Sequence, residues 1–137
     1  MELVIRSNNS DRELVFSNLE GHPGDEYFQV EIRGFELRAK TRVYAYGTDA
    51  GSLNEIFQRL GQLDRPWSDA KTWNSLEGEF SLAITCDKLG HVRFKITIQT
   101  VDSRGPAEEV YVAAGLTLDL GALPSIAKDA QKFFARG

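Results

Sequence analysis

The sequence predicts an α+β domain in which one antiparallel sheet of about six or seven strands carries two helices on one face. Most of the chain alternates apolar and polar residues with a period of two, which is typical of half-buried strands. Two segments instead repeat apolar residues at helical spacing, and each has a single apolar stripe. Because a sheet face and helix stripes can bury one another, we expect both helices on one face and a polar second face.

Length and composition limit the possible classes. At 137 residues, with 42% hydrophobic and 26% charged residues, the chain fits one ordinary soluble domain over residues 1–137. The net charge of −4 argues against nucleic acid as a partner. A single cysteine, Cys86, excludes an intrachain disulfide and a zinc site of several thiolates. The start of the chain lacks a signal-peptide pattern, and no apolar stretch approaches the ~18 residues of a membrane helix. We therefore expect a cytoplasmic protein without membrane contact.

The first quarter of the chain predicts two strands. Leu3 and Ile5 indicate a short first strand, and residues 8–11 form a turn cluster. A second strand is expected over 13–18, followed by a loop at 21–25.

Residues 26–46 alternate throughout and allow two arrangements. A hairpin with Arg33 and Gly34 as its loop aligns the apolar faces of both halves. The same register sets Glu31 against Glu36, which is an unfavourable pair of like charges. One long strand bent by a bulge at Gly34 is the alternative.

Two helices are expected. The first covers 52–63, because Ser52 and Glu55 form a capping box before an apolar stripe. The second follows Gly121, and Pro124 suits its first turn.

The second half of the chain contains the clearest hairpin. Strands over 80–86 and 92–98 flank a turn in which Gly90 takes the left-handed conformation, so that Cys86 pairs with Val92. This register puts every large apolar side chain of both strands on one face. An exposed turn at 102–106 and a last strand over 110–118 complete the prediction.

Few residues suit catalysis or metal binding. Glu77 and Glu79 could act as an acid–base pair, and His91 lies near a sheet end, so a pocket near these three residues is the alternative interpretation. Cys86 is expected to face the core as an inert thiol. His22 has only carboxylates nearby, which makes a poor metal cluster. We predict no catalytic residue, no metal site and no cofactor.

A binding surface is better supported. Arg33, Arg38, Lys40 and Arg42 form a basic stripe, which a solvated strand face explains best; if the stripe binds a partner, an acidic protein surface suits it better than nucleic acid. Of the two tryptophans, Trp73 is expected in the core, and Trp67 would be a binding anchor if it is exposed. The candidate binding residues are Trp67, Arg38, Lys40, Arg42, Arg93 and Lys95.

Several short motifs carry a family resemblance. The run W-x-S-L-E-G-x-F-x-L from Trp73, the G-H-V-x-F from Gly90, the L-T-L-D from Leu116 and the closing Phe133-Phe134 resemble a family of small bacterial proteins known only as a domain of unknown function. The first half, with L-E-G-H-P-G-D-E-Y-F-Q-V-E-I, is similar in layout to WapI-type immunity proteins. That resemblance implies a toxin-neutralising role and supplies no catalytic residues.

These observations predict a non-enzymatic protein-binding module. Its partner would be another protein, such as a toxin domain, or a second copy held through the polar sheet face or an open edge strand. The alternative is a small-molecule-binding or hydrolytic domain with a pocket near Glu77, Glu79 and His91.

Overall fold

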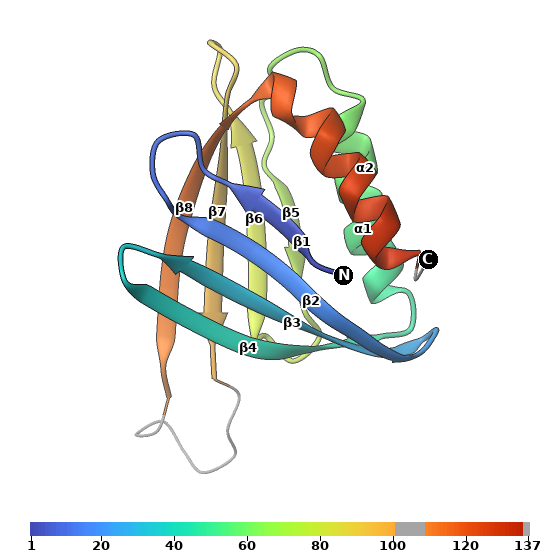
Figure 1. The fold of residues 1–137 in the computed structure, drawn as a ribbon. Coiled ribbons are helices and arrows are strands. Elements are labelled where there is room, and N and C mark those ends of the chain that lie inside the picture. Colours follow the sequence, from blue (N-terminus) through green and yellow to red (C-terminus); the bar gives the residue numbers. More distant parts are fainter. Residues whose placement is uncertain (101–108, 136–137) are drawn as a thin grey trace.

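The computed structural model describes residues 1–100 and 109–135, which form two four-stranded antiparallel sheets and two helices (Figure 1). The predicted α+β class is confirmed, whereas the prediction of one sheet with six or seven strands is wrong. The elements are β1 (Leu3–Arg6), β2 (Glu13–His22), β3 (Asp25–Gly34), β4 (Leu37–Tyr46), α1 (Asp49–Gly61), β5 (Lys71–Asn74), β6 (Phe80–Cys86), β7 (His91–Gln99), β8 (Tyr111–Asp119), a 3-10 turn (Leu120–Ala122) and α2 (Leu123–Phe134). The predicted turn at 102–106 lies outside the described residues.

The two sheets pack face to face. Sheet A has the order β1-β2-β3-β4 and sheet B the order β5-β6-β7-β8, so each sheet is a simple meander. Figure 1 shows the strands of sheet A crossing those of sheet B, with α1 and α2 side by side along the β1 and β5 side. The apolar strand faces therefore bury one another, and the helices close the end between the sheets instead of covering one sheet.

The core is organised around Phe16 of β2. Its ring lies 5.8 Å from Phe28 in sheet A, 5.8 Å from Phe80 in sheet B, 5.9 Å from Phe57 in α1 and 6.5 Å from Phe133 in α2, centroid to centroid. Tilted and edge-on ring pairs at such distances are favourable. One side chain therefore contacts both sheets and both helices.

Residues 26–46 form a hairpin, which is the first of the two predicted arrangements, but the turn is shifted. Gly34 pairs with Leu37, so the two-residue turn is Phe35-Glu36 and not Arg33-Gly34. Glu31 consequently lies opposite Lys40, and the like-charge pair does not form.

The β6–β7 hairpin confirms the sequence prediction. Cys86 pairs with Val92, and Gly90 has a φ of +86°. The fully buried side chains of both strands point into the sandwich, as the alternation requires. Cys86 itself is only partly buried at the end of its strand, and burial raises the pKa of its thiol.

The first helix begins three residues earlier than predicted. α1 starts at Asp49, so Ser52 lies inside the first turn and does not cap the helix. Its hydroxyl instead accepts the indole N–H of Trp73 at 3.0 Å. Trp73 is buried, as predicted, and sits in β5, a short strand that the sequence analysis missed. Among the described residues, neither helix has the length and apolar character needed to span a membrane.

A long-range contact joins the two sheets. The turn between β1 and β2 lies against β8, where the Asn8 N–H donates to the Thr117 carbonyl at 2.7 Å. The Thr117 N–H in turn donates to the Ser7 hydroxyl at 3.2 Å. The C-terminal part of the open edge of β8 is therefore already covered by the β1–β2 turn.

Candidate functional site

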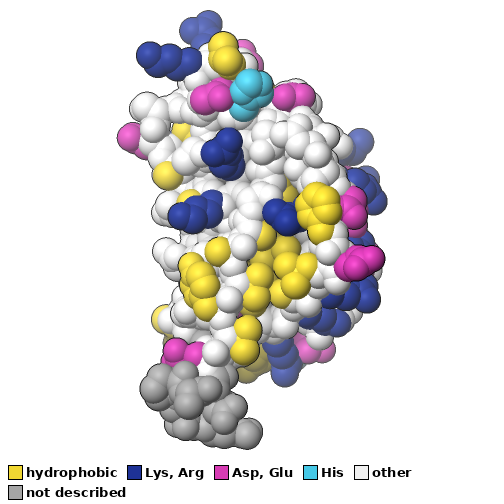
Figure 2. All heavy atoms as spheres, turned by 90° about the vertical axis from the view of Figure 1, so that its left-hand side faces the viewer, with side chains coloured by type: hydrophobic (Ala, Val, Ile, Leu, Met, Phe, Trp, Pro, Cys, Tyr) yellow, Lys and Arg dark blue, Asp and Glu magenta, His cyan; other side chains and the backbone are white. Residues whose placement is uncertain are grey.

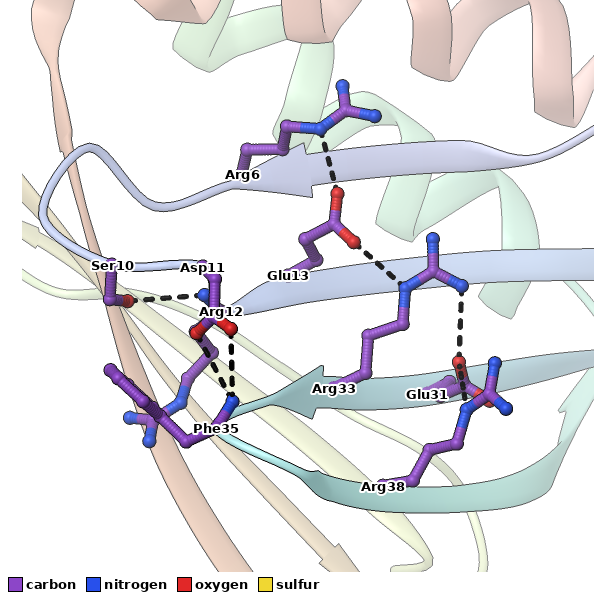
Figure 3. A network of polar contacts seen from close by, with 9 residues as sticks. All are labelled: Arg6, Ser10, Asp11, Arg12, Glu13, Glu31, Arg33, Phe35 and Arg38. Atoms are coloured by element: carbon purple, nitrogen blue, oxygen red, sulfur yellow. Dashed lines mark hydrogen bonds and ion pairs between the residues drawn. The ribbon is translucent and has the colours of Figure 1, made fainter.

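The predicted basic stripe lies on the outer face of β4, but neighbouring carboxylates neutralise much of it. Glu13 bonds Arg6 at 2.7 Å and Arg33 at 2.9 Å, and Glu31 bonds both Arg33 and Arg38 at 3.4 Å (Figure 3). The hydrogen bond with Glu13 raises the pKa of Arg33, so that side chain stays charged. The outer face of sheet A is thus an alternating ion-pair network and not a free cationic strip.

Arg42 is likewise engaged within the chain. Its guanidinium bonds Glu20 at 2.9 Å and lies 4.0 Å from the ring centroid of Tyr27, a cation–π distance. Tyr27 stacks on Tyr44 at 4.9 Å. A hydrogen bond to Asp25, together with burial, raises the pKa of Tyr44 to about 12.

Arg93 and Lys95 project from the outer face of β7, on the opposite sheet. Lys95 lines a shallow hollow of about 370 Å³ that also includes Tyr111. The structure therefore separates the predicted basic residues onto two outer faces, one on each sheet.

Trp67 is half-buried and packs against the core, so it is not a freely exposed anchor. Its indole N–H is buried and has no hydrogen-bond partner in the described part of the chain. An unpaired buried donor costs about 1–3 kcal/mol.

The three residues of the alternative pocket do not come together. Glu79 precedes β6 and faces Gln99, the last residue of β7, whereas His91 begins β7 at the other end of the hairpin. Glu77 is exposed and Glu79 is buried, with one carboxylate oxygen lacking a partner among the described residues. No cluster of three metal-ligating side chains occurs within residues 1–100 and 109–135.

His91 instead serves the hairpin turn. The Asp87 carboxylate accepts the backbone N–H groups of Leu89 and His91 and contacts His91 Nδ1, each at 2.9 Å. These contacts, led by the backbone bond from His91, lower the pKa of Asp87.

We expect Asp87→Ala to destabilise the protein at neutral pH and to lose this effect in acid. Because the folded pKa of Asp87 is lowered, its stabilisation is present above the ordinary carboxyl pKa of roughly 3.9 and disappears as the pH falls through the folded value. Urea unfolding of wild type and variant across this range measures the difference. Lys88→Ala, in the same exposed turn, is the control, and an Asp87 effect that persists at the acid end would contradict the prediction.

One cleft lies between α1 and β5. It has a volume of about 420 Å³, and its lining includes Glu55, Arg59 and the buried Trp73. Its lining contains none of the residues that the sequence analysis singled out for binding or chemistry. The cleft is open, and the groups that line it do not form a nucleophile–base pair.

A different surface has the character of a docking site, and sequence analysis missed it. Phe35, Leu37, Val110 and Tyr111 are large hydrophobic residues with exposed fractions of 62%, 49%, 56% and 64%. Figure 2 shows hydrophobic side chains gathered on the side of the molecule where the β3–β4 turn meets β8. Exposed apolar clusters of this kind mark interaction sites more often than isolated apolar residues do.

Phe35 is held at this surface in a strained conformation. Phe35 and Glu36 have φ values of +53° and +63°. These lie in the left-handed region, which costs a non-glycine residue roughly 1–2 kcal/mol. The Asp11 carboxylate accepts the Phe35 N–H at 3.1 Å, and the Arg12 guanidinium lies 5.2 Å from the ring centroid (Figure 3). Positive φ at both central residues is what a two-residue type I′ hairpin turn requires, so the turn holds Phe35 in this exposed position.

The neighbouring strand β8 presents unpaired backbone groups. The Val110 carbonyl accepts a hydrogen bond from the Thr100 N–H, and the Leu120 N–H donates one to the Gly90 carbonyl. The even-numbered residues of β8 therefore point their backbone N–H and C=O groups toward β7. The odd-numbered residues then point their N–H and C=O groups away from the sheet. Thr117 is satisfied by the β1–β2 turn, and the Gly115 carbonyl accepts a 3.5 Å bond from Arg12.

Three residues of this edge therefore remain open. The N–H and C=O groups of Tyr111 and Ala113 and the N–H of Gly115 have no partner among the described residues. We call these groups, together with Phe35, Leu37, Val110 and the Tyr111 side chain, the β8 edge surface.

The other sheet edges are protected. β1 and β5 have only four residues each, and β4 carries Arg38, Lys40 and Arg42. Short strands and charged side chains are the usual means of preventing edge pairing. β8 is long and has no charged residue between Tyr111 and Leu118, so it is the edge that can accept another strand.

Comparison with known proteins assigns the chain to a family and supplies no activity. The model of a family of unknown function, DUF6228, matches residues 5–137. No curated protein matches the chain.

Proposed function

Since the chain belongs to DUF6228, a family whose description assigns no activity, we propose a function from its geometry. We propose that it is a non-enzymatic protein-binding module and that its docking site is the β8 edge surface. The observation that carries this proposal is the row of unpaired backbone groups on β8 beside four exposed hydrophobic side chains.

The edge favours recognition by strand addition. Backbone N–H and C=O groups spaced every second residue are complementary to the backbone of another extended chain. The hydrophobic side chains beside them would bury the alternate side chains of that added strand. The backbone of a nucleic acid has no such row of alternating N–H and C=O groups, and the net charge of −4 opposes its binding.

Basic side chains flank the hydrophobic centre from both sheets. Arg38 follows Leu37 on β4, and Lys95 pairs with Gly115 on the neighbouring strand β7. Interfaces commonly have such an apolar centre and a polar rim. The rim gives the predicted Lys95 and Arg93 a role in steering association with acidic side chains of a partner, and Arg38 contributes where its 3.4 Å pair with Glu31 is exchanged.

A toxin domain is one partner of this kind, in keeping with the resemblance to WapI-type immunity proteins. We propose the cytoplasm as the compartment where such a partner is met. The open edge and the hydrophobic side chains beside it support protein binding, and the toxin-neutralising role depends on the resemblance alone.

The experiment is capture of partners by immobilised protein from a lysate of its own organism, with two variants of one edge residue. Ala113→Pro removes an N–H that points away from β7, so the β7–β8 ladder is retained. Ala113→Ser keeps that N–H and changes the side chain by one hydroxyl.

We expect wild type and Ala113→Ser to retain a protein that Ala113→Pro loses, by at least about tenfold. Circular dichroism melting confirms that all three are folded. A protein retained equally by all three would place the docking site elsewhere. In a second comparison, Arg38→Glu with Lys95→Glu is expected to slow association in a manner that salt suppresses.

A further inference from the structure

We propose that the β8 edge receives a second copy of this chain, with β8 paired antiparallel to β8 about a twofold axis through Ala113. This inference depends on the proposed docking site and names its occupant. It rests on three properties of Tyr111–Gly115: the direction of the backbone groups, the order of side-chain sizes and the absence of charge.

The backbone groups match those of a second copy. In an antiparallel ladder, two residues that both point toward each other exchange a pair of hydrogen bonds. With the axis at Ala113, that residue faces its own copy, and Tyr111 faces Gly115 of the other copy. All three residues have outward-pointing groups, so this register pairs every open group of the edge.

The side chains are also self-complementary. The segment reads Y-V-A-A-G, so side-chain size falls from Tyr111 to Gly115, with two equal alanines in between. Reversal about Ala113 places each large side chain beside a small one: Tyr111 beside Gly115, and Val112 beside Ala114. An aromatic ring beside a glycine on a neighbouring strand covers backbone that would otherwise be bare, and no like charges meet in this window.

The surroundings fix the length of the pairing. The β1–β2 turn occupies Thr117, so the added strand must leave the edge after five residues. At Gly115 only the long 3.5 Å contact from Arg12 has to be exchanged. Figure 1 shows the β3–β4 turn, which contains Phe35, projecting past β8 on the sheet A side, so this turn would cover the inner side of the added strand.

The first test uses cross-linking, because a twofold axis makes one residue its own neighbour. In a Cys86→Ser background, Ala113→Cys should form a disulfide-linked dimer under mild oxidation, since facing Cα atoms lie about 5.5 Å apart. Tyr111→Cys alone should not, because the two copies of residue 111 are offset by four residues, or ~13 Å. Combining Tyr111→Cys with Gly115→Cys should restore cross-linking.

The second test uses charge and needs no oxidation. Ala113 is exposed, so Ala113→Glu and Ala113→Lys should both fold, and each should raise the dimer dissociation constant about two- to fivefold through self-repulsion. An equimolar mixture should restore dimers containing one chain of each kind. Sedimentation of each variant and of the mixture across a concentration series measures this, and matched Tyr111→Glu and Tyr111→Lys chains, which face Gly115, should gain nothing on mixing.

The outcomes separate this inference from the proposed function. A monomer at every concentration, without Ala113→Cys cross-linking, overturns the second copy as occupant. If Ala113→Pro then still loses a captured protein, the docking site stands and its occupant is a different chain. A dimer whose dissociation constant is insensitive to charge at Ala113 would also overturn the proposal, because its interface would lie elsewhere.

Discussion

Replacement of Phe16 by alanine is expected to lower the free energy of unfolding by about 3–5 kcal/mol. The side chain is fully buried and contacts rings from both sheets and both helices. Because its neighbours belong to four separately anchored elements, they cannot all move inward to fill the space. The loss therefore combines the transfer free energy of the ring with the cost of a cavity.

Urea unfolding followed by tryptophan fluorescence measures this effect. Leu89→Ala is the control, because Leu89 is 82% exposed in the β6–β7 turn and its removal should change stability by less than ~0.5 kcal/mol. A loss below ~2 kcal/mol for Phe16→Ala would show that the core can collapse around the site, contrary to the packing described above.

Alanine at Gly61 should also destabilise the protein, by about 1–3 kcal/mol, although alanine is the better helix former. A Cβ at this position would lie 2.5 Å from the Ala127 Cβ of α2. The backbone around Gly61 and the helix of Ala127 are both regular, so relief requires the two helices to separate. Separation of the helices would lengthen the 2.8 Å hydrogen bond that the Gln58 side chain donates to the Ala127 carbonyl.

Gly51 provides a matched control within the same helix. A Cβ there meets nothing within 4 Å, so Gly51→Ala should raise stability by about 0.5–1 kcal/mol through helix propensity alone. Chemical denaturation of both variants decides the matter. Two changes of the same sign would mean that helix packing does not distinguish the two positions.

The sequence predicted local structure well where two signals agreed. In the β6–β7 hairpin, the alternation of both strands and the glycine at the turn permit a single register, and that register is observed. In the β3–β4 hairpin the two central turn residues are Phe35 and Glu36. Both adopt positive φ although neither is a glycine or an asparagine, the residue types that usually indicate such a turn. Turn chemistry pointed to Gly34, and the prediction was displaced by two residues.

Sheet count could not be predicted from periodicity. A strand with one apolar face reads the same whether that face packs on helices or on a second sheet. The pairing of Phe16 with Phe80, which joins sheet A to sheet B, joins residues far apart in the chain and leaves no local signal.

The candidate site was missed for a related reason. The sequence predicts β8 at nearly its observed position, but its uncharged run has neither the charged nor the aromatic pattern that indicates a binding site. That run is informative only once β8 is known to be an edge, which depends on the sheet order. The signal was the lack of charge from Tyr111 to Leu118 in the last strand that the sequence predicts.

The position of Phe16 also constrains how the chain is made. Its partner rings in α1, β6 and α2 are synthesised progressively later, and Phe133 follows it by more than a hundred residues. At ~5–20 residues per second, a nascent chain waits on the order of ten seconds between the two. During that interval the apolar inner face of sheet A is not fully covered. The nascent chain therefore needs the ribosome or a chaperone to keep β2 from associating with other chains until α2 has been synthesised.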